Sequence, residues 1–368
     1  MTLGSRLGSR DNNFDLLRLT AALLVVFAHS WNTSLNTSDP VSLAIGYGLG
    51  NVGLMVFFTI SGLLIAKSAE QNGLFAFAVS RGLRILPALL AVTVFEAFVV
   101  APIFFDGDAR AFLTSAAPWE HLKNATVFLG RFQIDGVFVG HAKTGLNGST
   151  WTLPIEAALY VVVAMAATAG CLTRRTCLAA FVACWSLYAY MTAAGHTDFV
   201  NNGPEIIRRV HLYPFAKWGS FFLLGAVFWK HRDSIRLDGR LALLCLGSLL
   251  LLKGMKPVTC VPFAAYLVVY VGLGLRSTAG FFERTGDISY GIYVFSWPIQ
   301  QWCIAVSSRT ITPVELAAIS IPISVLVGFA SWTLIEKPAL GLRRILLRKG
   351  PILAGADTGV GAAKAGAS

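Results

Sequence analysis

The chain has 368 residues, of which 55% are hydrophobic and only 13% charged, and its mean hydropathy is +0.65. Soluble globular chains carry about 25% charged residues, so this composition excludes a soluble fold and indicates an integral membrane protein. The formal net charge of +11 follows from membrane topology, and no motif supports nucleic-acid binding.

Ten apolar segments are long enough to cross a hydrocarbon core of roughly 30 Å as helices of about 20 residues. Barrel strands would instead alternate over about ten residues, so we predict an all-α integral membrane protein with about ten transmembrane helices. Six cysteines lie in or beside these segments without metal-ligand spacing, and we predict no metal site. The predicted spans are 14–31, 46–66, 86–105, 151–171, 176–194, 214–229, 240–255, 257–274, 289–306 and 313–335.

Most of the 30 lysines and arginines fall on the side of these spans that includes both chain ends. The positive-inside rule makes that side cytoplasmic, with both termini, and leaves 106–150 as the longest outer loop. We expect a cytoplasmic tail over 1–13, a transmembrane domain over 14–338 and a basic, then disordered, cytoplasmic tail over 339–368. The expected location is the inner (cytoplasmic) membrane.

The first span, "DLLRLTAALLVVFAHS", contains both Arg18 and His29. Eleven residues place their side chains on nearly the same helix face, with a rise of about 16 Å between them. An arginine at a helix end is often a snorkelling anchor, and Asp15 can simply neutralise it. A histidine well inside a span is costly and usually faces a cavity or a partner, so we predict a functional role for His29.

Basic residues also gather at the cytoplasmic side of the second and third spans. Arg81 and Arg84 in "SRGLRILP" share a helix face ahead of Pro87, and Lys67 ends the second span. Guanidinium groups bind phosphate oxygens bidentately, so Arg81 and Arg84 could form a basic mouth with Arg18. A loop that merely obeys the positive-inside rule would show the same pattern.

The fourth span begins with "WTLPIEAALY", which contains Trp151, Glu156 and Tyr160. Glu156 is expected at about the depth of His29, where a carboxylate could accept the imidazole N–H and raise its basicity. Tyr160 follows by four residues and shares the face of Glu156. Glu96 in the third span is an alternative carboxylate for this role.

These motifs resemble those of the acyltransferase-3 family of membrane-bound O-acyltransferases. The first span has the family's pattern of Arg, ten residues and His. Five further stretches follow in the family's order, and the match is collinear over about residues 14–338. They are "GLMVFFTISGLLIAKS", which includes Ser61, "RGLRILP", "WTLPIEAALY", "DISYGIYVFSWPIQQ" and "WTLIEKPAL".

The resemblance implies ten core helices, a cytoplasmic acyl-CoA co-substrate and no permanently bound cofactor. The acyl group is expected to be acetyl, and the acceptor a hydroxyl of a surface polysaccharide or lipid-linked glycan beside the membrane lipids. The phosphates of coenzyme A would be held by Arg18, Arg81, Arg84 and Lys67. His29, oriented by Glu156, would then take the proton from the acceptor hydroxyl.

The resemblance does not settle the roles of the residues in the late helix. Many relatives have a histidine where this chain has Ser296, so His29 would act without a second histidine. Tyr290, Tyr293 or Ser296 would polarise the thioester carbonyl, and a covalent acyl-histidine relay is an alternative.

Two other function classes remain open at this point. In a proton-coupled transporter, His29, Glu156 and Glu96 would relay protons and the arginines would bind an anion. Such transporters commonly contain inverted repeats, and the chain shows no internal symmetry. A non-catalytic component of a glycan export system is the other class, and thioester consumption would separate the enzyme from both.

Overall fold

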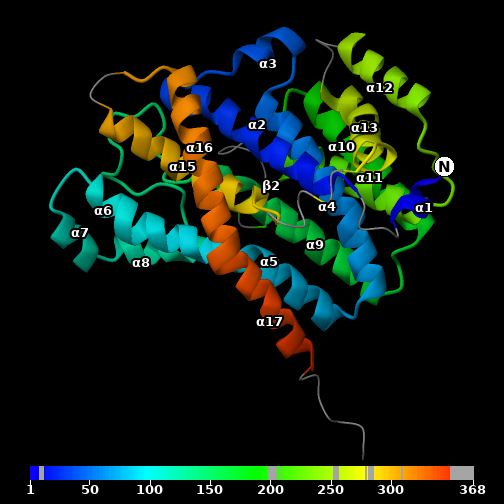
Figure 1. Cartoon of the computed structure of the whole chain (residues 1–368), viewed down its shortest axis with the longest axis horizontal. Helices are drawn as coiled ribbons and strands as arrows, with labels where there is room; N and C mark the ends of the chain where they lie inside the picture. The colour runs from blue at the N-terminus through cyan, green and yellow to red at the C-terminus, as the bar shows by residue number, and fades with distance from the viewer. Residues whose placement is uncertain are drawn as a thin grey trace, which may run out of the picture.

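The computed structural model describes residues 1–7, 12–197, 205–207, 209–251, 257–277, 280, 286–307 and 310–348. Nearly all of the described chain is helical, and its long helices pack side by side (Figure 1). Two short strands, β1 (Glu205–Ile207) and β2 (Val210–His211), form an antiparallel hairpin.

Apart from α17, the longer helices overlap the ranges in which the sequence predicted spans. They are α2 (Phe14–Leu35), α4 (Leu49–Gln71), α5 (Leu74–Phe95), α9 (Leu153–Thr168), α10 (Arg174–Ala193), α11 (Leu212–Lys230), α12 (Gly239–Leu251), α13 (Cys260–Gly274), α15 (Ser289–Val306), α16 (Pro313–Ser331) and α17 (Lys337–Arg348). The short helices are α1 (Leu3–Leu7), α3 (Pro40–Ile45), α6 (Ala101–Ile103), α7 (Ala109–Thr114) and α8 (Ala117–His121). Two π-helical turns, Glu96–Val100 and Trp332–Glu336, join α5 to α6 and α16 to α17.

Six helical segments of the described chain are long and apolar enough to cross a membrane. They are Phe14–Leu35, Leu49–Gln71, Leu74–Ile103, Gly148–Thr168, Arg174–Ala193 and Pro313–Leu347. The helices α11 and α15 and the shorter α12 and α13 fill the other four predicted ranges. The prediction of an all-α membrane protein is confirmed, whereas the count of ten spans and the side of the termini remain predictions.

Two boundaries differ from those expected. The third span was predicted to begin at 86, but α5 begins at Leu74, so Arg81, Arg84 and Pro87 all lie inside one helix. The expected tail 339–368 begins inside α17, which continues α16 in Figure 1. Its predicted disorder concerns 349–368, which lies outside the described residues.

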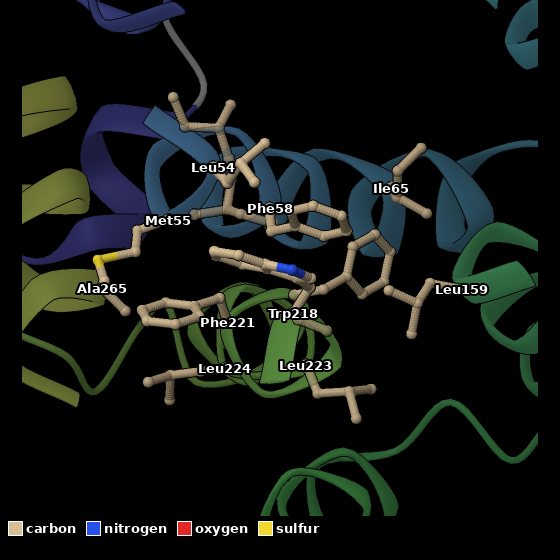
Figure 2. Packing of buried hydrophobic residues seen from close by; sticks show 14 of the residues in the cluster. Leu54, Met55, Phe58, Ile65, Leu159, Trp218, Phe221, Leu223, Leu224 and Ala265 are labelled. Atoms are coloured by element: carbon tan, nitrogen blue, oxygen red, sulfur yellow. The ribbon is translucent and has the colours of Figure 1, made fainter. Parts of the chain in front are cut away.

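The helix α11 is buried along almost its whole length and forms the centre of the packing. Trp218 stacks on Phe58 of α4 with ring centroids 5.6 Å apart, among the aliphatic side chains in Figure 2. The backbones approach so closely that a Cβ on Gly62 would overlap the Phe222 carbonyl, and one on Gly53 would lie 2.6 Å from a carbonyl of α2. The helix α4 is therefore held in place on both sides, which fixes the position of the side chains that it contributes to the site.

Candidate active site

A cavity of about 580 Å³ lies among α2, α4, α5, α9, α15 and α17, and we call it the arginine cavity. All four basic residues that were predicted to hold the phosphates line it, so the structure brings them together. Basic side chains at its wall are Arg18, Lys67, Arg81, Arg84 and Arg343, and polar ones include Ser61, Glu156, Tyr160, Tyr290 and Tyr293.

Arg18 and Arg84 are already engaged by carboxylates. Arg18 lies 2.8 Å from Asp15 and 3.3 Å from Asp287, while Arg84 lies 2.5 Å from Asp287 and 3.3 Å from Glu336. Burial alone would raise the pKa of Asp287, but the two guanidinium groups hold it below its ordinary value. Because the ion pairs join four separate parts of the chain, both arginines hold the wall of the cavity together.

The other basic residues of the cavity are more available to a ligand. Arg81 has a buried Nε atom without a hydrogen-bond partner in the described chain, and no carboxylate there lies within 4 Å of it. Lys67 donates to the carbonyl of Leu7 at 3.0 Å, which leaves two of its N–H groups. Arg343 lines the same wall from α17. These three cations are better suited to an anionic ligand than Arg18 and Arg84.

Glu156 does not orient His29 in this structure. Its carboxylate accepts hydrogen bonds from Ser61 at 2.7 Å and Tyr160 at 2.5 Å, and it lines the arginine cavity only. The expected contact is wrong because the 3₁₀ turn Gly148–Thr152 already lies inside the bundle, which carries the following turn of α9 past His29.

His29 lines a second cavity of about 440 Å³, which we call the histidine cavity. Its imidazole meets the indole of Trp297 edge to face, with ring centroids 4.9 Å apart. Trp151 is also in this wall, so the fourth span does reach His29, but through Trp151. Buried Lys217 lines the cavity too and donates to Asn51 at 3.2 Å.

The two cavities meet at Leu54 and Tyr293, which line both. Arg18 and His29 stand in different cavities, about 16 Å apart along α2 by helix rise. The single face predicted for these two residues therefore runs along both cavities.

The three candidates in α15 have different positions. Tyr290 lines the arginine cavity and donates to the carbonyl of Ile85 at 3.0 Å. Tyr293 donates its proton to the carbonyl of Ser149 at 2.5 Å, so it forms a wall and has no proton left to polarise a carbonyl. Ser296 is fully buried and lines neither cavity.

Glu96, the rival carboxylate, lies in neither cavity. It is buried between His121 at 2.9 Å and Asn147 at 2.6 Å, both from the long loop 106–150. Asn147 also donates to the carbonyl of Val294 at 2.8 Å. Glu96 therefore anchors the loop against α5 and α15.

Four site residues escaped the sequence analysis. Lys217 lies inside a predicted span and met the criterion that singled out His29, and Glu336 stands in the "WTLIEKPAL" motif. Asp287 lies two residues before the predicted span 289–306. Arg343 was assigned to the tail, and only its position on α17 shows that it lines a cavity.

The chain is therefore a helical membrane protein in which a cationic cavity adjoins a cavity lined by a histidine. A comparison with known protein families identifies the class of enzyme. The family model described as "Acyltransferase domain" matches residues 11–335, so the chain belongs to this acyltransferase family and is a multi-pass membrane acyltransferase.

Two curated relatives are similar over nearly their whole length. The "O-acetyl transferase" of Shigella phage Sf6 is 25% identical, with 94% of this chain and 98% of the relative covered. "Nodulation protein 10" of Rhizobium leguminosarum bv. viciae is 28% identical, with 92% and 95% covered. No solved structure matches the chain.

Proposed function

We propose that this protein transfers an acetyl group from acetyl-CoA, bound from the cytoplasm in the arginine cavity, to a glycan hydroxyl that enters the histidine cavity. The contact of the two cavities at Leu54 and Tyr293 carries this proposal. Coenzyme A has its phosphates at one end and its thioester at the other. It therefore suits a path with cations at one end and His29 at the other, along a wall where Arg18 and His29 lie about 16 Å apart on α2.

In the arginine cavity, Arg81, Arg343 and Lys67 bind the phosphates of the donor. Arg81 is the strongest candidate, because a guanidinium with an unused buried N–H gains a charge-assisted hydrogen bond when phosphate arrives. Glu156 lies further along the same cavity, where its carboxylate can accept an amide N–H of the pantetheine arm.

In the histidine cavity, His29 acts as general base. Its imidazole takes the proton of the acceptor hydroxyl while the hydroxyl oxygen attacks the thioester carbonyl. The ester C–O bond forms, the thioester C–S bond breaks, and the proton passes from the imidazolium to the departing thiolate, which leaves as the free thiol of coenzyme A. General base catalysis of this kind typically contributes about 10² to 10⁴ in rate.

The proposed acceptor is supported by the family and by the name of the phage relative, "O-acetyl transferase". Trp151 and Trp297 give the histidine cavity flat aromatic walls, which suit the apolar faces of sugar rings. The positive-inside rule directs the arginine cavity toward the cytoplasm and the histidine cavity outward, in the inner membrane.

The test measures thiol release by the purified protein in nanodiscs with acetyl-CoA and a glycan fraction from cells that lack the gene. We expect thiol release and ester-linked acetyl on the glycan with the wild type, and neither with His29→Ala. His196→Ala is the matched control, since His196 is exposed and lines neither cavity. Absence of thioester consumption by the wild type, with unchanged ester content in cells lacking the gene, would overturn the proposal.

A further inference from the structure

The side chains of Leu54 and Tyr293, which we call the partition, separate the two cavities. Leu54 belongs to α4 and is 8% exposed, and Tyr293 belongs to α15 and is 6% exposed. A donor that reaches from the cations toward His29 therefore passes beside these two side chains.

Tyr293 is the rigid half of the partition. Its hydroxyl donates to the carbonyl of Ser149 at 2.5 Å and lies 2.6 Å from the hydroxyl of Thr152. The ring of Phe57 packs against it edge to face, with centroids 5.8 Å apart and an interplanar angle of 66°. Movement of this ring would break two buried hydrogen bonds, so its position is fixed.

Leu54 is the adjustable half, because an aliphatic side chain has no hydrogen bond to hold it. Its backbone cannot retreat, since the neighbouring Gly53 already packs against the carbonyl of Ala21 in α2. The volume of the Leu54 side chain therefore sets the room available at the partition.

We infer that the partition limits the transferred acyl group to about the size of acetyl and that Leu54 is the residue that determines this specificity. The inference rests on the proposed function. With the donor's phosphates in the arginine cavity and the base in the histidine cavity, the thioester carbonyl has to lie at the partition, and its acyl chain beside Leu54. Each methylene beyond acetyl then needs space that Leu54 occupies.

The experiment compares initial rates of thiol release with acetyl-CoA, propionyl-CoA and butyryl-CoA, using the same glycan fraction as acceptor. One extra methylene in a pocket that excludes it typically costs 10-fold to 200-fold in rate, so the wild type should lose at least about tenfold from acetyl to butyryl. Leu54→Ala should raise the ratio of butyryl to acetyl transfer about tenfold or more.

Leu64→Ala is the matched control, because Leu64 is on the same helix and lines the arginine cavity about 15 Å from the partition. Its butyryl-to-acetyl ratio should stay within about twofold of the wild type. Leu54→Val, a smaller change, should shift the ratio in the same direction if Leu54→Ala does not fold, and Leu54→Phe should shift it the other way.

A folded Leu54→Ala or Leu54→Val with the wild-type ratio would overturn the inference, as would an equal shift in Leu64→Ala. Both results leave acetyl transfer by the wild type intact. Failure of the proposed function is a different result, in which the wild type consumes none of the three thioesters.

Discussion

Arg84 and Arg81 lie one helical turn apart on α5, yet their replacement by alanine should affect different properties. Loss of Arg84 should lower the stability of the protein, whereas loss of Arg81 should weaken binding of acetyl-CoA. Removal of Arg84 leaves Glu336, whose side chain is 1% exposed, with Ser331 as its remaining hydrogen-bond partner in the described chain, at 3.0 Å. Asp287 keeps its ion pair with Arg18, at 3.3 Å. Loss of one partner of a buried ion pair costs about 3–5 kcal/mol. Because the Arg84 side chain is 23% exposed, screening by solvent lowers the expected loss to about 2–3 kcal/mol.

The loss is measured as the apparent unfolding temperature of the purified protein in nanodiscs. At about 2 °C per kcal/mol for a large chain, Arg84→Ala should lower this temperature by about 5 °C. The double variant Arg84→Ala/Glu336→Gln should recover part of the loss, because it also removes the uncompensated buried charge.

Arg81→Ala should leave the unfolding temperature nearly unchanged, because no carboxylate of the described chain lies within 4 Å of Arg81. Its effect should instead appear as a rise of about tenfold or more in the KM for acetyl-CoA, equivalent to about 1.4 kcal/mol. Arg81→Lys should restore only part of the affinity for acetyl-CoA, because a lysine cannot bind phosphate oxygens bidentately. Equal destabilisation by both alanine variants, or a double variant no more stable than Arg84→Ala, would refute this division of roles.

Three further predictions concern the base, the ion-pair network and the orientation. His29→Ala should lower kcat by about 10²-fold or more with little change in the KM for acetyl-CoA, since His29 lies outside the donor's cavity; a matching rise in KM would contradict this. The folded-state pKa of Asp287 is lowered, so its contribution to stability is present above the unfolded value of about 3.9 and is lost as pH falls through the lowered pKa. Unfolding temperatures should thus fall more steeply below about pH 4 in the wild type than in Asp287→Asn, and parallel curves would argue against the effect. In a background without native cysteines, Gly73→Cys should be protected from an impermeant thiol reagent in intact spheroplasts and Gln133→Cys labelled; the reverse pattern would invert the orientation.

The helices and the basic mouth could be predicted because both depend on information within one segment. Hydropathy over about 20 residues locates a helix, and the spacing of Arg81 and Arg84 places them on one face. The ion-pair partners could not be predicted in the same way. Asp287 and Glu336 lie more than 200 residues from Arg84 in sequence, and only the packing of the helices brings them together.

The expected pair of His29 and Glu156 shows where reasoning from depth along a helix is insufficient. It assumed that the fourth span begins at the membrane edge, so that Glu156 would lie one turn inside. In the structure, Gly148 packs against Trp297 within the bundle, and the chain has already reached the level of His29 at Trp151. The inward path of a loop leaves no periodic signal in a sequence.

The position of Trp297 suggests how His29 is oriented without Glu156. The indole N–H donates to the carbonyl of Gly145 at 2.9 Å, and a Cβ on Gly148 would lie 2.6 Å from the ring, so the indole is held on two sides by the long loop. The imidazole packs edge to face against this fixed surface, which restricts the rotation of the ring. The carboxylate of Asp39 also lines the histidine cavity, but it is occupied by the backbone N–H groups of Ser42 and Leu49. If His29 is the base, as proposed, its orientation depends on a loop that Glu96 anchors from outside both cavities. Glu96 would then be a positioning residue at a distance from the chemistry.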